Sequence, residues 1–204
     1  MGTSEVRLVN ESGRTIGFGE RWQTHKVRNG PDGPILGQKH VGITIACLDG
    51  AGRVLIAHRR HKIFDRVWTL SGDTHPYRAS GSLEVETILR AAKRCAMDDL
   101  SARIQSWRRK LTLSYSARDS RDPRWCENEL LHIMVAKYSG PLRMNPKNAY
   151  ELRWMKLDDV YNEAAGDLEK EPIDRKYAPW VHALFALQTG QVEEALRART
   201  ATAR

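Results

Sequence analysis

Apolar residues recur along this chain at two spacings, one typical of strands and one typical of helices. Two apolar runs, residues 41–48 and residues 54–58, flank Asp49-Gly-Ala-Gly52, where Asp and Gly favour a tight turn. We therefore expect two strands joined as a hairpin. Three more strands are expected at residues 111–117, 130–138 and 152–157, the second with Leu131, Ile133 and Val135 pointing inward.

Helical spacing is clearest between Ser82 and Leu100. One side of this segment is apolar and the other polar; the apolar side carries Val85, Ile88, Ala92, Cys95 and Met97, and the polar side Glu84, Arg90, Lys93, Arg94 and Asp98. Residues 158–170 and 177–190 are also expected to be helical and to pack on the sheet, the second opened by Pro179 and ended near Gly190. These elements predict a mixed fold in which strands surround a central helix.

The chain is expected to form one domain over residues 1–190, followed at residues 191–204 by a helical end and a disordered tail. Its 204 residues, of which 41% are hydrophobic, suffice for one core. No segment has the roughly 18 apolar residues of a membrane span, and the N-terminal residues do not resemble a signal peptide. Within the loop 27–39, the Gly- and Pro-rich residues 29–34 are not expected to form a regular element.

Net charge and cysteine content narrow the kinds of ligand and the cellular compartment that we expect. The net charge of +8 is compatible with nucleic acid or a small polyanion, but the basic residues are spread out, with short clusters only at residues 58–62 and 108–110. We expect a solvated basic surface and a phosphate-bearing small ligand rather than nucleic acid. Cys47, Cys95 and Cys126 have unrelated spacings and are expected to be reduced thiols of a cytoplasmic protein.

Two short stretches carry the candidate chemistry. In CENE, Glu127 and Glu129 would share one face of a strand about 7 Å apart, which favours a cation between them, although an exposed acidic edge is the alternative. VWTLSGDTHP places Asp73 two residues before His75, so that an acid would lie beside a metal ligand, although a plain turn is the alternative. With His25 and His40 the chain could offer three imidazoles and two carboxylates to a metal.

Over about residues 8–184 these features resemble the type I isopentenyl diphosphate isomerases of the Nudix superfamily. The resemblance rests on GERWQTH ending at His25, His40 before a strand, Arg59-Arg60, VWTLSGDTHP, CENE, and YAPW ending at Trp180. It implies an α+β fold, an α/β/α sandwich with a mixed sheet flanked by helices. It also implies a divalent metal, zinc or manganese, held by His25, His40, His75, Glu127 and Glu129.

The same resemblance implies the other site residues. Basic side chains would approach the diphosphate of the substrate, namely Arg21, Arg60, Lys62 and Arg94, and Asp98 would help to hold Mg²⁺ on it. Tyr115 would lie beside the reacting alkene and Trp180 would face its cation. Because such a cation needs an aromatic face, Trp68 is a further candidate beside these two. Glu129 would bridge metal and substrate. Arg21 and Asp98 stand where the family has lysine and glutamate.

Asp73 occupies the position of the family's catalytic cysteine. A carboxylic acid transfers protons as a thiol does, and burial raises its pKa, so our hypothesis is that Asp73 is the catalytic acid of a metal-dependent isomerase of isopentenyl or other prenyl diphosphates. The alternatives are a protonation-initiated terpene cyclase or double-bond isomerase on a longer prenyl diphosphate, a Nudix diphosphohydrolase, and a non-catalytic binder. Hydrolysis is disfavoured because AAKRCAMDDL lacks the Arg-Glu-x-x-Glu-Glu pattern of such enzymes. Oligomeric state is not predicted.

Overall fold

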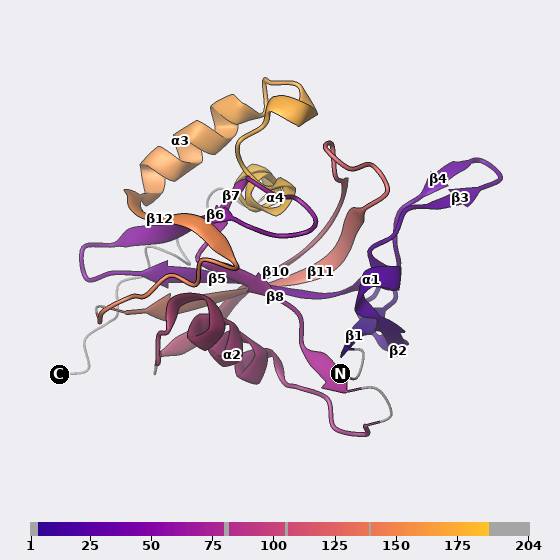
Figure 1. Ribbon diagram of the computed structural model, residues 1–204, viewed down its shortest axis with the longest axis horizontal. Helices are drawn as coiled ribbons and strands as arrows, with labels where there is room; N and C mark the ends of the chain where they lie inside the picture. Colours follow the sequence, from indigo (N-terminus) through magenta and orange to yellow (C-terminus); the bar gives the residue numbers. More distant parts are fainter. Residues whose placement is uncertain (1–3, 80–81, 105, 139, 188–204) are drawn as a thin grey trace.

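A mixed β-sheet lies at the centre of the molecule and separates one helix from two others (Figure 1). The computed structural model describes residues 4–79, 82–104, 106–138 and 140–187. The strands are β1 (Ser4–Val9), β2 (Thr15–Glu20), β3 (Arg28–Gly30), β4 (Gly33–Ile35), β5 (His40–Leu48), β6 (Arg53–Arg59), β7 (Trp68–Leu70), β8 (Gly72–Thr74), β9 (Tyr77–Ala79), β10 (Trp107–Arg118), β11 (Cys126–Lys137) and β12 (Ala149–Lys156). The helices are α1 (Arg21–Thr24), α2 (Ile88–Leu100), α3 (Leu157–Asp167) and α4 (Pro179–Leu187), with a 3-10 turn at Pro172–Asp174.

Strand β5 is central to the sheet, which has the order β10-β11-β5-β1-β2. It runs parallel to β11 and antiparallel to its other partners, and β8 pairs with it over three residues. All of its residues are buried, which explains why it is mainly apolar, because a strand covered on both faces has no side exposed to water. The register places His40 opposite Glu129, so two predicted ligands meet at one end of neighbouring strands.

Each face of the sheet carries its own apolar core. On one face α2 packs through residues including Ala92, Cys95 and Leu100 against Ile43 and Ile45 of β5. On the other face α3 and α4 pack through Val160, Trp180, Val181 and Leu184 against Leu131 and Ile133 of β11. The layers are therefore helix, sheet and helix, as the α+β sandwich requires (Figure 1).

The strand predictions are confirmed in type and place. Residues 111–117, 130–138 and 152–157 lie within or largely within β10, β11 and β12, and Leu131, Ile133 and Val135 are buried. The turn at residues 49–52 joins β5 to β6 as expected, but the two strands pair only at Leu48 and Val54. Beyond this point β6 leaves β5 and pairs with β7 and β12.

Helix α2 begins later than the apolar spacing predicts. Val85 pairs with Arg78 and the Glu86 N–H donates to the carbonyl of Tyr77, so this segment extends the sheet instead. Thr87 then caps the helix by accepting a hydrogen bond from the N–H of Arg90 at 3.2 Å. The predicted apolar side is also partly wrong, since Met97 is 42% exposed.

Two further expectations are corrected. Residues 29–34 do belong to a regular element, because β3 and β4 form a two-stranded ribbon that projects from the body (Figure 1). Pro34 fits there because a two-stranded ribbon leaves one edge of each strand unpaired. The strands do not surround a helix: α2 covers one face of the sheet.

The predicted helix end near Gly190 and the tail at residues 191–204 lie outside the described residues. Residues 158–167 and 179–187 are helical as expected. Among the described helices, none has both the length and the apolar character to cross a bilayer. The three cysteines are buried and unpaired.

Candidate metal centre and acid pair

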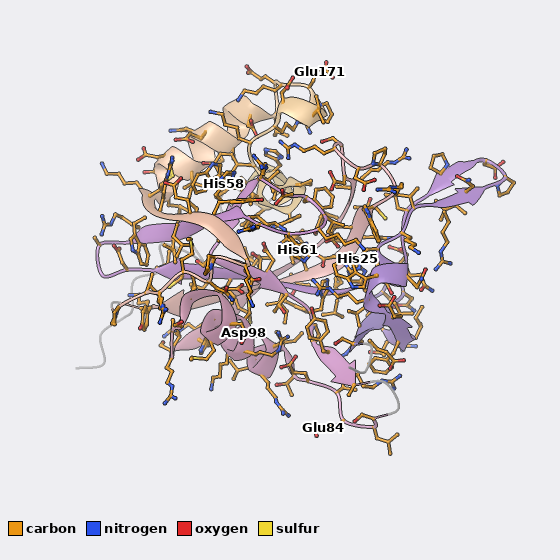
Figure 2. All side chains as sticks on the ribbon, in the orientation of Figure 1. His25, His58, His61, Glu84, Asp98 and Glu171 are labelled. Carbon is orange, nitrogen blue, oxygen red and sulfur yellow. The ribbon has the colours of Figure 1, made fainter. Side chains whose placement is uncertain are left out.

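Three buried histidines, His25, His40 and His75, converge in the interior; His25 is labelled in Figure 2. The ring centroids of His25, His40 and His75 lie 4.5 to 5.1 Å apart. Nδ1 of His25 donates to the carbonyl of Arg21 at 2.6 Å, and Nδ1 of His40 to that of Gln38 at 2.8 Å. Since a carbonyl only accepts, these contacts leave Nε2 of both rings free to act as a ligand.

Two buried carboxylates face these imidazoles from β11, as the one-residue spacing of CENE predicts. Oε2 of Glu127 lies 3.0 Å from Nε2 of His25 and 3.5 Å from that of His40. Oε1 of Glu129 lies 3.1 Å from Nε2 of His75 and 3.4 Å from Nε2 of His40, while its Oε2 accepts a hydrogen bond from Tyr115 at 2.7 Å. Tyr115 thus leaves one Glu129 oxygen directed at the histidines.

The donor set fits a divalent cation. Ligand atoms of His25, His40, His75 and Glu127 all lie within 4.8 Å of one another, close to the about 4.2 Å that opposite ligands of one ion span at metal–ligand distances of about 2.1 Å. Nε2 of His40 and Oε2 of Glu127 are buried and make no hydrogen bond of good geometry. A bound cation would provide a partner for both atoms. Buried polar atoms in proteins are rarely left without one.

The pKa values of His40 and Glu129 also favour a positive charge at this position. Burial alone would lower the pKa of His40, but Glu127 and Glu129 beside it raise that pKa to about 10. Burial would raise the pKa of Glu129, as would Glu127, but His40 and His75 bring it to about 2. The pocket therefore favours a positive charge next to its carboxylates, which a metal ion can supply in place of a proton.

Gly42 makes room for this arrangement. It pairs with Leu131 on the neighbouring strand, and a Cβ at this position would collide with the carboxylate of Glu129. A glycine here lets the carboxylate lie directly against the backbone of β5.

Asp73 lies on β8 and its two carboxylate oxygens have different surroundings. Oδ2 accepts hydrogen bonds from Thr69 at 2.8 Å and from Arg59 at 3.1 Å, whereas the buried Oδ1 has no hydrogen-bond partner. Burial raises the pKa of Asp73 to about 6 against the opposing effect of Arg59. A plain turn residue would be solvated, so Asp73 has the environment of a proton-transfer group.

A small pocket of about 20 Å³ lies between Asp73 and three of the candidate metal ligands, His75, Glu127 and Glu129. Its walls include Asp73, Glu129, Tyr115 and Trp180. The ring centroids of Tyr115 and Trp180 lie 6.1 Å apart, and the Trp180 side chain is buried on α4. The structure thus brings together two carboxylates and two aromatic rings around one confined space.

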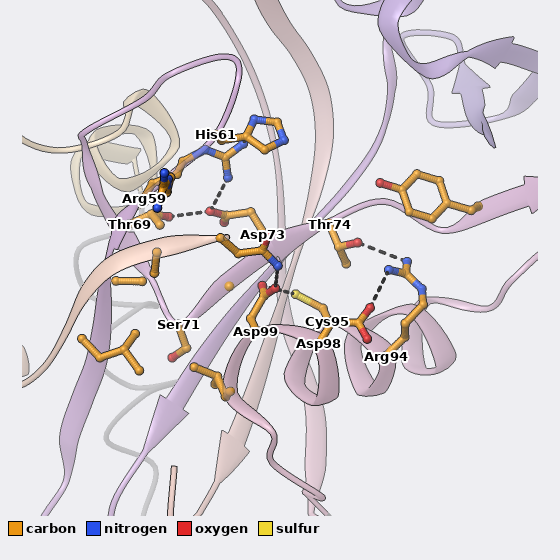
Figure 3. Close-up of a pocket in the computed structure, with 18 of the residues that line it drawn as sticks. Arg59, His61, Thr69, Ser71, Asp73, Thr74, Arg94, Cys95, Asp98 and Asp99 are labelled. Atoms are coloured by element: carbon orange, nitrogen blue, oxygen red, sulfur yellow. Dashed lines mark hydrogen bonds and ion pairs between the residues drawn. The ribbon is translucent and has the colours of Figure 1, made fainter. Parts of the chain in front are cut away.

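A larger polar cavity of about 320 Å³ opens on the other side of Asp73 (Figure 3). Three predicted basic residues line it, namely Arg21, Arg60 and Arg94, together with Asp98. The guanidinium of Arg94 is held by Glu86 at 3.0 Å and donates to the carbonyl of His75 at 2.9 Å. Arg94 therefore also supports the segment formed by β8, which carries Asp73, and by His75 just after it.

Other predicted substrate residues lie elsewhere. The ammonium of Lys62 lies over the rings of Trp22 and Trp125, at 4.6 and 4.3 Å, and lines neither cavity at Asp73. Trp68 stacks on His58 at 4.9 Å, outside both cavities. Arg60 is exposed at the rim and donates to the carbonyl of Pro146.

Asp98 does not join the histidine cluster. It lies on α2, with its side chain 58% exposed and 3.8 Å from Arg94, at the edge of the larger cavity (Figures 2 and 3). Its neighbour Asp99 lies deeper and accepts hydrogen bonds from Cys95 and Asn148. Any role of Asp98 with a metal would thus concern a ligand in that cavity, not the histidine site.

Arg59, His61 and Thr69 line the larger cavity, although the sequence predicts no role for them; Arg59 entered only as part of the matched Arg59-Arg60 pair. Arg59 contacts Asp73, lies 5.3 Å from the Trp180 ring centroid, and donates to Nδ1 of His61 at 2.9 Å. Two adjacent arginines at a strand end point to different sides, so only one could face Asp73. The sequence alone offers no signal that this one is Arg59 rather than Arg60.

Comparison with known proteins supports the expected superfamily. The isopentenyl-diphosphate Δ-isomerase of Dictyostelium discoideum is 25% identical over 197 residues, covering 86% of this chain and 81% of that protein. No protein-family model matches the chain.

Solved structures establish the fold. A protein of Deinococcus radiodurans superimposes with a TM-score of 0.59 at 16% identity, covering 88% of this chain and 96% of that one. A MutT protein of Methanosarcina mazei Go1 gives 0.50 at 9% identity, covering 79% of this chain and 96% of that one. The fold is thus the Nudix-like α+β fold that the sequence predicts.

Proposed function

We propose that this protein is a metal-dependent isomerase that shifts the double bond of isopentenyl diphosphate, by protonating the alkene at one carbon and removing a proton from another. The observation that carries the proposal is the small pocket, where Asp73 and Glu129 share the walls with Tyr115 and Trp180. The isomerase from Dictyostelium discoideum, similar over most of both chains, supports it.

Each group has a role in this chemistry. Asp73, whose Oδ1 is unpaired, donates a proton to the terminal alkene carbon, and the electron pair of the double bond forms the new C–H bond. The tertiary cation that results is stabilised by the faces of Trp180 and Tyr115. Glu129 then accepts a proton from the carbon on the other side of the cation, and that C–H pair becomes the new double bond. The substrate gains one proton and loses one, so its composition is unchanged.

The cation held by His25, His40, His75, Glu127 and Glu129, for which we propose zinc or manganese, would fix the Glu129 carboxylate and lower its basicity. Arg21, Arg59, Arg60 and Arg94 would bind the diphosphate in the larger cavity, with Mg²⁺ near Asp98. We place the reaction in the cytoplasm, since three buried free thiols suit a reducing compartment.

The lining of the larger cavity favours a short substrate over the longer prenyl diphosphates of a cyclase. It consists mainly of charged and polar side chains, which suit a diphosphate better than an isoprenoid chain.

The test is incubation of the metal-loaded protein in deuterated water with isopentenyl, geranyl, farnesyl and geranylgeranyl diphosphates in separate reactions. We expect deuterated dimethylallyl diphosphate from the five-carbon substrate and no change in the others. A cyclic deuterated product from a longer chain, or release of inorganic phosphate or phosphate monoester, would refute the proposal in favour of a cyclase or a hydrolase.

A further inference from the structure

The hydroxyl group of Thr69 joins the carboxyl group of Asp73 to the ring of Trp180. Nε1 of Trp180 donates to Oγ1 of Thr69 at 2.8 Å, and Oγ1 of Thr69 donates to Oδ2 of Asp73 at 2.8 Å (Figure 3 shows the second contact). Thr69 and Trp180 are both buried, with 3% of each exposed. The three side chains come from β7, β8 and α4, so the bridge links elements far apart in sequence.

The directions of these two hydrogen bonds are fixed by chemistry. An indole N–H can only donate, so the Thr69 oxygen must accept from Trp180. The single hydroxyl proton of Thr69 is then available for Asp73, whose Oδ2 must accept it. Because Oδ2 also accepts from Arg59, a proton carried by Asp73 belongs on Oδ1.

Backbone hydrogen bonds hold Thr69 in this position. β7 pairs with β6, with Thr69 opposite Ala57. The N–H of Trp68 donates to the carbonyl of Lys176, and the N–H of Ala178 donates to the carbonyl of Trp68, which attaches β7 to the segment that leads into α4. The hydroxyl therefore acts from a fixed backbone, and its loss would leave the strand in place.

We propose that Thr69 is a positioning residue that, through one hydroxyl, orients both the Asp73 carboxyl and the Trp180 ring toward the reacting alkene. The proposal rests on the proposed isomerase function for its kinetic consequence. Arg59 cannot replace the hydroxyl, because it contacts Oδ2 but offers no acceptor to the indole N–H.

The kinetic test compares Thr69→Val with Thr69→Ser. Valine keeps the shape and removes both hydrogen bonds, whereas serine keeps both. Since small misplacements of reacting groups cost up to about 100-fold, we expect Thr69→Val to lower kcat about 10- to 100-fold with little change in KM, and Thr69→Ser to stay within about threefold of the parent. Thr69→Ala is the second variant, and thermal unfolding identifies any variant that does not fold.

A spectroscopic test needs no substrate. The indole N–H resonance of Trp180, assigned in ¹⁵N-labelled protein by its loss in Trp180→Phe, reports the hydrogen bond to Thr69. We expect it to move to lower proton frequency in Thr69→Val and Thr69→Ala and to stay close to its parent position in Thr69→Ser.

An unmoved indole resonance in folded Thr69→Val and Thr69→Ala would overturn the bridge. So would a Thr69→Val enzyme with parental kcat, or a loss that appears only in KM. If the parent protein isomerises none of the diphosphates, the proposed function fails and the orienting role in that reaction fails with it, while the resonance separately decides whether the bridge exists.

Discussion

The two cavities beside Asp73 differ in size and in the way their side chains are held. The small pocket, of about 20 Å³, is walled by histidine-paired carboxylates and aromatic rings; Tyr115 donates a hydrogen bond to Glu129, and Thr69 accepts one from Trp180. The larger cavity, of about 320 Å³, is lined by charged side chains that contact one another, such as Arg94 with Asp98 at 3.8 Å.

Under the proposed function, this difference would separate proton transfer in the small pocket from diphosphate binding in the larger cavity. Side chains fixed by several contacts suit proton transfer, where small displacements are costly, whereas long cationic side chains around an open space suit an anion that arrives from solvent. Asp73 lines both cavities and so lies where a substrate with an alkene at one end and a diphosphate at the other would span them.

The largest effect is expected from Asp73→Asn, which keeps the shape of the side chain but cannot donate a carboxylic proton. General acids contribute about 10²- to 10⁴-fold, so turnover of isopentenyl diphosphate should fall by that range. Metal content, measured by mass spectrometry, should be unchanged. Retained turnover would remove Asp73 from the mechanism and leave the small pocket without its acid.

Gly42→Ala should disable the small pocket through its metal site. The added Cβ would collide with the Glu129 carboxylate, so we expect substoichiometric metal and a roughly 10- to 100-fold loss of turnover, as for disturbed metal-site support. Gly166→Ala is the matched control, because its Cβ meets no atom within 4 Å and alanine favours a helix. Full metal content in Gly42→Ala would contradict the close fit of Glu129 against β5.

Arg59→Gln and Arg60→Gln form a neighbouring pair that tests the larger cavity. Arg59 is directed at Asp73, whereas Arg60 is exposed and bonded to a loop carbonyl. A hydrogen bond to a charged group is worth about 1.5–3 kcal/mol, so Arg59→Gln should lower kcat/KM by roughly 10- to 100-fold, and Arg60→Gln by less than about tenfold. A larger loss of kcat/KM in Arg60→Gln than in Arg59→Gln would contradict this expectation. It would favour Arg60, the residue that the family resemblance implies, as the main contact of the substrate.

The smallest effect concerns the segment that carries Trp180. Asp167 accepts from the backbone N–H groups of Lys176 and Tyr177, at 2.9 and 2.8 Å, and from His182 at 3.1 Å. Burial alone would raise the pKa of Asp167, but these donors hold it below its usual value. Asp167→Asn should cost about 1–3 kcal/mol of unfolding free energy near neutral pH.

The sign of the pH dependence follows from that lowered pKa. The unfolded chain binds the proton more readily, so the stabilisation is fully present above the unfolded pKa of about 3.9 and is lost as pH falls through the lower folded pKa. Burial also lowers the pKa of His182, which adds a loss of stability that begins below its usual pKa of about 6.5. Urea unfolding between about pH 2.5 and 7 should therefore show a flatter acid limb in Asp167→Asn, with His182→Gln separating the histidine contribution. An unchanged limb below about pH 4 would exclude Asp167 as its source.

Predictions from local patterns were reliable for features that depend on a single strand or turn. The apolar runs predicted β10, β11 and β12, and the one-residue spacing predicted that Glu127 and Glu129 share a face. Predictions failed where another strand competes for the backbone. Val85 fits a helical spacing, but pairing with Arg78 in the preceding strand β9 keeps it in the sheet.

The sequence by itself determined a mixed α+β fold and the presence of an acid two residues before His75, because each depends on residue identity and on periodicity within one segment; the Nudix-like form of that fold was implied by the family resemblance. Only the tertiary structure decided that Arg59 rather than Arg60 contacts Asp73, that Lys62 and Trp68 lie outside both cavities, and that Thr69 joins Asp73 to Trp180. These contacts join β6, β7, β8 and α4, and their distances depend on how the strands and helix pack, which no local pattern encodes.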